Sequence, residues 1–151
     1  MRTSFKHTTV GAAILATAVF FFTAAHGQAA PNPAAKNWTI TVGPGPCDLT
    51  ESGKPAPTQA ISKKKQHKIV WQSDAKQTLS IVVHVPANCP APFNNMKKGG
   101  KDKQGNDLWT VDCTNDTCKS GPAVKKACEQ EYKYDQILGG KSCDGLIIIE
   151  P

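Results

Sequence analysis

The sequence of 151 residues contains one arginine, Arg2, and lacks several patterns on which common activities depend. No Gly-x-Ser-x-Gly segment is present, so the nucleophile elbow of the α/β-hydrolases is missing. All basic residues after Arg2 are lysines, whereas nucleic-acid-binding surfaces mix arginine and aromatic residues into their basic stripes. No cysteine precedes Cys47, so we expect no lipid-modified cysteine at the start of a mature chain. The sequence therefore predicts neither an enzyme nor a nucleic-acid-binding protein.

The first residues have the pattern of a secretory signal peptide. Arg2 and Lys6 are followed by a largely apolar stretch without charges, residues 8–25, and Ala25-His26-Gly27 fits the small-x-small pattern of a cleavage site. An uncleaved membrane anchor is the alternative, because a span needs about 18 apolar residues. The many Ala and Thr residues favour cleavage. We expect residues 1–27 to be removed and the protein to be secreted or periplasmic, without membrane contact afterwards.

The remaining chain has the length of one domain. We expect residues 28–37 to be a flexible lead-in and residues 38–151 to form a single domain. Removing Arg2 and Lys6 from the 18 basic residues leaves 16 against 12 acidic ones, a net charge of +4. Lysines gather at residues 63–68 and 97–103. We expect solvated loop lysines there, and binding of an acidic surface polymer is the alternative.

All the cysteines lie in the exported part: Cys47, Cys89, Cys113, Cys118, Cys128 and Cys143. An even number in an exported chain predicts disulfide bonds, although the sequence does not choose among the possible pairings. Cys113 and Cys118 are near enough to bridge locally. A zinc site is the weaker alternative, because this pair would need partners from Cys128, Cys143 or His84, and no second short spacing supplies them.

The periodicity of the chain is that of β-strands. Alternating or β-branched residues predict strands at residues 38–42, 68–72, 79–85, 108–112, 131–135 and 146–150. The last of these contains Leu-Ile-Ile-Ile, so we expect it to be central and buried. Residues 123–131 could form one or two helical turns. Residues 86–107, with three prolines and Gly99-Gly100, are expected to be a long irregular loop. The predicted class is an all-β sandwich.

The end of the chain resembles the end of a cupredoxin domain, the plastocyanin/azurin family. Tyr132-Lys-Tyr134 is similar to the aromatic-x-aromatic strand of that family, and Gly139-Gly140 and Gly145 lie in and after the loop that follows it. Strands 68–72 and 79–85 are similar to the middle of bacterial cupredoxin-like domains. The resemblance implies a cupredoxin-like Greek-key β-sandwich with a long insertion at residues 86–127.

The resemblance also implies where a type 1 copper site would lie. Such a site uses a Cys thiolate, two His and a weak axial Met. The loop positions of Cys, His and Met in the family correspond here to Gln136, Gly139 and Cys143, and no His stands where the first one is expected. We therefore expect no cofactor. A divergent copper site formed by His84, Met96 and Cys143 is the alternative, and it needs a free Cys143 thiol.

Together these patterns and the resemblance predict an exported, disulfide-stabilised cupredoxin-like module, a binding or structural protein that acts through contacts with a protein or glycan at the cell surface or in the periplasm. Recognition is expected at residues 86–107, because long irregular loops on rigid sandwiches often bind partners. Deleting residues 94–106 is predicted to spare folding and to abolish binding. A copper-binding electron-transfer protein with a divergent site is the alternative.

Overall fold

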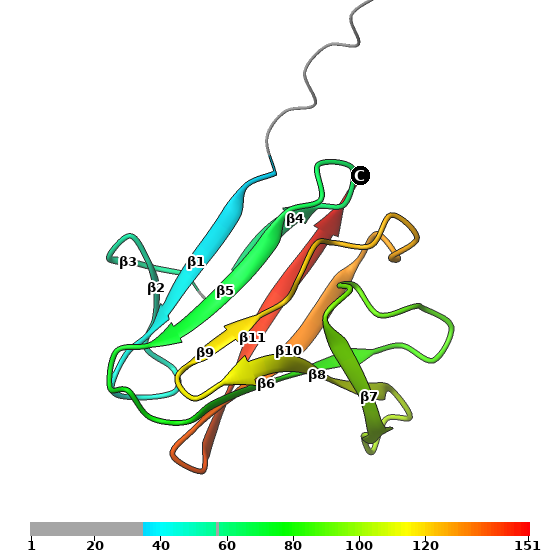
Figure 1. Cartoon of the computed structure of the whole chain (residues 1–151). Helices are drawn as coiled ribbons and strands as arrows, with labels where there is room; N and C mark the ends of the chain where they lie inside the picture. The colour runs from blue at the N-terminus through cyan, green and yellow to red at the C-terminus, as the bar shows by residue number, and fades with distance from the viewer. Residues whose placement is uncertain (1–34, 57) are drawn as a thin grey trace, which may run out of the picture. The chain divides into compact units, whose positions relative to one another are not determined.

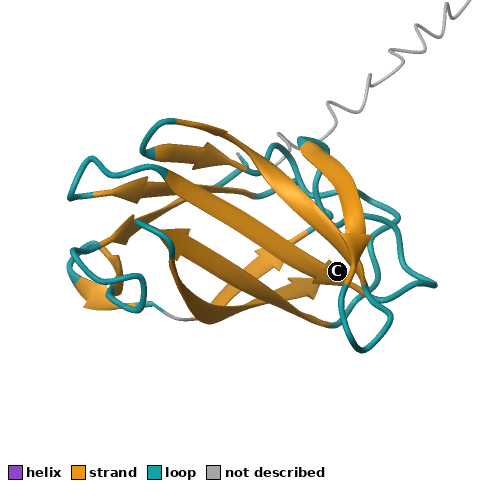
Figure 2. Cartoon of the chain, turned by 90° about the horizontal axis from the view of Figure 1, so that it is seen from below, coloured by secondary structure: helices purple, strands orange, loops and turns teal. Residues whose placement is uncertain are grey.

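The computed structural model describes residues 35–56 and 58–151, which contain eleven strands and no helix (Figure 1, Figure 2). The strands are β1 (Asn37–Val42), β2 (Leu49–Glu51), β3 (Lys54–Pro55), β4 (Thr58–Ser62), β5 (Lys68–Ser73), β6 (Leu79–Val85), β7 (Met96–Lys101), β8 (Asp107–Thr114), β9 (Thr117–Lys119), β10 (Glu131–Leu138) and β11 (Lys141–Glu150). The all-β prediction is therefore confirmed. The expected signal peptide lies outside the described residues. Within residues 35–56 and 58–151, no helix could span a membrane.

One strongly curled sheet holds these strands, in the order β3-β2-β1-β5-β9-β8-β6-β10-β11-β4, with β7 added beside β8. The curl places the strands in two layers around the core (Figure 2). Strand β8 belongs to both layers, because its first half pairs with β6 and β7 and its last residues pair with β9. Two pairings are parallel, β1 with β5 and β4 with β11, and both join strands that are not neighbours in the chain.

The core consists of the inward residues of alternating strands. Along β6, Leu79, Ile81, Val83 and Val85 are buried while the residues between them are half-exposed. A half-buried strand has this period of two, and each large apolar side chain that is fully buried contributes about 1.5–3 kcal/mol. The largest buried side chains are those of Trp71, Tyr132, Tyr134 and Phe93, so both tyrosines of the aromatic-x-aromatic strand belong to the core.

The closing strand β11 lies between β10 and β4, as its apolar sequence predicted. Burial is confined to one face of it. Ile147 and Ile149 point inward and are buried, whereas Ile148 is half-buried and Leu146 is 37% exposed. In the described part of the chain, no further layer covers the outer face of this strand. The expectation of a central strand is therefore confirmed, whereas the expectation of a buried strand holds for one face only.

Two local predictions were wrong. Residues 123–131 form no helix. Ala127 N donates to Val124 O at 2.9 Å in a single turn, whereas Ala123 N donates to His67 O and Val124 N to Pro92 O, at 3.0 and 2.9 Å, in distant segments. Residues 86–107 are not wholly irregular, because they include β7. Lysine and glycine have low strand propensity, so the pairing of β7 with β8, not local sequence, determines that strand.

All six cysteines are paired, as Cys47–Cys143, Cys89–Cys128 and Cys113–Cys118. The third bridge is the local one expected from the sequence, and it joins two residues that are directly opposite in the β8–β9 hairpin. The second ties the segment after β6 to the segment before β10. The first ties the β1–β2 connection to β11, the strand that closes the domain.

Candidate functional site

Each of the three positions that the resemblance assigns to copper ligands has a structural role in this protein. Gln136 is fully buried on β10, and its Nε2 donates to Pro46 O at 2.6 Å. Cys143, directly opposite Gln136 on β11, is bonded to Cys47. Gly139 lies at the turn between the two strands with φ of 55°, a conformation that favours glycine. The Cys47–Cys143 bond and the Gln136–Pro46 hydrogen bond thus attach the connection before β2 to the two positions where a copper ligand would be expected from the resemblance.

The alternative copper ligands His84, Met96 and Cys143 are not brought together. On β8, His84 lies opposite Leu108, whereas Met96 lies opposite Val111, three residues further along. Cys143 lies beyond β10, and its sulfur is oxidised. Within the described residues, no group of three His, Cys, Asp or Glu side chains is arranged to hold a metal ion. These residues do not fit a copper site, and the bridged Cys113 and Cys118 lack the thiolates that zinc would need.

His84 is instead held between two carboxylates. Its Nδ1 lies 2.8 Å from Asp102 Oδ2 and its Nε2 lies 2.9 Å from Asp135 Oδ2. The three side chains are 15, 10 and 26% exposed. An imidazolium donates from both ring nitrogens, so only the charged form satisfies both carboxylates at once. The contact joins β6, the β7–β8 turn and β10, and we refer to these three residues as the histidine clamp.

The two carboxylates set the protonation of the histidine clamp. Burial alone would lower the pKa of His84, but the hydrogen bonds to Asp102 and Asp135 outweigh it and raise the pKa. The hydrogen bond from His84 holds the pKa of Asp102 well below its ordinary value. Asp102 also accepts bonds from the backbone N–H groups of Gln104 and Asn106, at 2.9 and 2.8 Å. This carboxylate therefore orders the β7–β8 turn and attaches it to the sheet.

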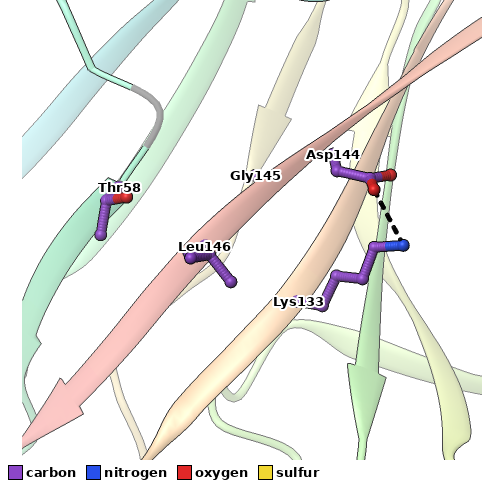
Figure 3. Close-up of a pocket in the computed structure, with 5 residues that line it drawn as sticks. All are labelled: Thr58, Lys133, Asp144, Gly145 and Leu146. Atoms are coloured by element: carbon purple, nitrogen blue, oxygen red, sulfur yellow. Dashed lines mark ion pairs between the residues drawn. The ribbon is translucent and has the colours of Figure 1, made fainter.

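Lys133 extends the charged contacts across the outer face of β10 and β11. Its Nζ lies 3.0 Å from Asp144 Oδ2 and 3.9 Å from Asp135 Oδ1. The hydrogen bond between Lys133 and Asp144 raises the pKa of the ammonium and lowers that of the carboxyl. Beside this pair lies a shallow pocket of about 380 Å³, whose lining also includes Thr58, Gly145 and the exposed Leu146 (Figure 3). Among the lining side chains, those of Thr58, Lys133 and Asp144 can hydrogen-bond a polar ligand, and Leu146 adds an apolar contact surface.

The lysines of β7 lie close to acidic residues. Lys98 and Lys101 contact Asp107 at 2.7 and 3.3 Å, and Lys97 lies 4.0 Å from Asp112. The hydrogen bond from Lys98 lowers the pKa of Asp107, whose side chain is only 9% exposed. Two aspartates therefore offset part of the positive charge of the second lysine run, which sequence spacing did not indicate.

The chain matches no protein-family model, and neither a curated protein nor a solved structure matches it significantly. The resemblance to cupredoxins thus rests on the residues quoted above.

Proposed function

We propose that the protein is an exported, disulfide-stabilised cupredoxin-like module that binds a partner through its surface and has no blue-copper site. One observation carries this proposal. The Cys47–Cys143 bond and the hydrogen bond from Gln136 to Pro46 use the side chains at the ligand positions for structure. The three disulfide bonds support export to an oxidising compartment, because such bonds persist outside the cytosol.

The β7–β8 hairpin remains a candidate recognition element, but deleting residues 94–106 is not a sound test of it. The deletion removes β7 and also the bonds from Asn94 N to Pro122 O and from Asn95 N to Ser120 O, both 3.1 Å. Loss of binding could then reflect loss of structure. Because Asp107 and Asp112 offset part of the charge of the three β7 lysines, an acidic partner also gains less here than at a surface with unpaired lysines.

Copper titration tests the proposal. We expect the oxidised protein to show no intense visible band when copper is added, and metal analysis after desalting to find no tightly bound copper. The variant Cys47→Ser frees the Cys143 thiol and serves as the matched control for thiolate access. An intense copper–thiolate band in the unmodified, oxidised protein would contradict the proposal and favour an electron-transfer role.

A further inference from the structure

Two loops that are distant in sequence bring lysines together at one end of the domain. The turn between β4 and β5 carries Lys63, Lys64 and Lys65, and the segment between β9 and β10 carries Lys125 and Lys126. Figure 1 shows both segments beside the C-terminus. Lys63 joins them, since its Nζ donates to Ala127 O at 3.0 Å and lies 3.0 Å from Glu129 Oε1. We refer to these five lysines as the lysine end.

Four of these lysines have no acidic partner. Lys64, Lys65, Lys125 and Lys126 are exposed, and within residues 35–56 and 58–151 no carboxylate oxygen lies within 4.0 Å of their ammonium groups. This distinguishes the lysine end from β7, where neighbouring aspartates take up the charge. Clustered charges of one sign produce a local potential that attracts anions.

The positive field also acts on a neighbouring side chain. Burial lowers the pKa of His67, and the nearby charges of Lys65 and Lys36 lower it further, while Glu150 opposes them. Lys36 lies at this end because its carbonyl accepts a bond from Lys68 N at 3.1 Å. Lys36 Nζ itself lies 3.7 Å from Glu51 Oε1, so the unpaired lysine charge at this end belongs to the two loops.

The lysine end contains a groove of about 380 Å³. It is lined by Lys63 and Lys64 from one loop, by Lys125 and Glu129 from the other, and by Pro151. Lysines thus stand on both sides of it. A linear polymer can lie in such a groove and meet both loops, whereas a flat bilayer would touch only the outermost ammonium groups.

We propose that the lysine end binds an acidic polysaccharide, a linear chain of sugars that carry carboxylate or sulfate groups. The inference rests on the proposed binding function and specifies the partner. Lysine is a compact point charge on a flexible stem and lacks the planar fork with which arginine recognises a phosphate or carboxylate in one geometry. No arginine occurs in the described residues. A surface with lysines and no arginine is suited to several weak ionic contacts along a polymer whose anionic groups repeat.

Binding of the purified full chain to immobilised polygalacturonate, measured across a salt series, tests the proposal. The quadruple variant Lys64→Gln, Lys65→Gln, Lys125→Gln and Lys126→Gln removes the unpaired charges. We expect its affinity to fall by at least about tenfold, because four ammonium groups no longer neutralise anionic groups of the polymer. Its salt dependence should also become shallower, because fewer counterions are released.

A second quadruple variant supplies the matched control. Lys54, Lys76, Lys103 and Lys141 are exposed, are scattered over other elements and likewise have no carboxylate within 4.0 Å among the described residues. Replacing all four with Gln removes the same net charge. We expect its affinity for polygalacturonate to stay within about threefold of the unmodified chain, since charges farther away than about one Debye length are screened.

Three results would overturn the proposal. Equal weakening by both quadruple variants would attribute binding to net charge alone. No binding of the unmodified chain to polygalacturonate at low salt would exclude this partner. Tighter binding to anionic phospholipid vesicles or to duplex DNA, at the same salt, would assign the lysine end to another class of anion. None of these results alters the copper titration, so the proposed function and this inference fail separately.

Discussion

Tyr134 on β10 lies directly opposite Gly145 on β11, and its ring occupies the space that a side chain at position 145 would need. The ring also packs edge-to-face against Trp71, with 5.7 Å between the centroids, and its hydroxyl donates to Gln59 Oε1 at 3.1 Å. One aromatic residue thus connects β10, β11, β5 and β4. Glycine is required at position 145 for space, because a Cβ there would lie 2.4–2.6 Å from ring atoms of Tyr134.

Gly145→Ala should therefore destabilise the domain. Over-packing a core by one methyl group typically costs about 1–3 kcal/mol, and chemical denaturation would measure the loss. Gly100→Ala is the control, because a Cβ there meets no atom within 4 Å. We expect the control to change the free energy of unfolding by less than about 0.5 kcal/mol. Equal effects of the two substitutions would show that the Tyr134 ring does not fill this space.

Tyr134→Phe should lower stability without altering the shape of the core. It leaves Gln59, which is 1% exposed, without the donor for its Oε1, and an unsatisfied buried acceptor costs about 1–3 kcal/mol. Tyr132→Phe is the comparison. The hydroxyl of Tyr132 donates to Cys128 O at 3.2 Å in a less buried place, where water can replace it. We expect the smaller loss of stability for Tyr132→Phe. Thermal or denaturant unfolding of both variants measures which of the two is less stable.

The histidine clamp should make stability fall as the pH rises above about 6.5 and through the raised pKa of His84. The pKa of His84 is raised in the folded protein. Its contribution is therefore complete below the unfolded pKa of about 6.5 and is lost as the pH rises through the folded pKa. The difference in unfolding free energy between the unmodified protein and His84→Gln should shrink over this interval. Denaturation at a series of pH values, with an NMR titration of the imidazole, measures both quantities.

His67→Gln should show the opposite trend. The pKa of His67 is lowered, first by burial and then by Lys65 and Lys36. Its neutral form is favoured in the folded state, so its contribution is present above about pH 6.5 and is lost as the pH falls through the folded pKa. The same slope for both variants would mean that the carboxylates of Asp102 and Asp135 do not hold His84 in its charged form.

Removal of single bridges should destabilise the protein to different degrees. Cys47 and Cys143 are separated by 96 residues, and a loop of this length predicts a loss of about 4–5 kcal/mol when both are changed to Ser. The separation of 5 residues between Cys113 and Cys118 predicts about 2 kcal/mol. Before any substitution, alkylation without reductant should label none of the cysteines, as judged by intact mass. A labelled Cys143 would contradict the bridge.

Local patterns predicted the strands that bury one face, and long-range contacts decided the rest. The β-branched residues of 79–85 predicted the strand β6, in which buried and half-buried positions alternate. Strand β7 was missed because Lys-Lys-Gly-Gly-Lys has no apolar period and forms a strand only by pairing with β8. His84 was correctly placed in a strand. Its partners were not foreseen, because Asp102 and Asp135 are 18 and 51 residues away in sequence and only the sheet register unites them.

The three bridges are nested: the first cysteine pairs with the last, the second with the fifth, and the third with the fourth. A chain emerges N-terminus first, so oxidation in order of appearance would join Cys47 to Cys89, which are not partners in the native fold. Cys47 can pair with Cys143 only after the chain has emerged as far as residue 143, because 96 positions separate the two cysteines, and β4 likewise has to wait for β11. Correct maturation therefore demands either an oxidant that acts after β11 has emerged or a catalyst that reshuffles early, mispaired disulfides.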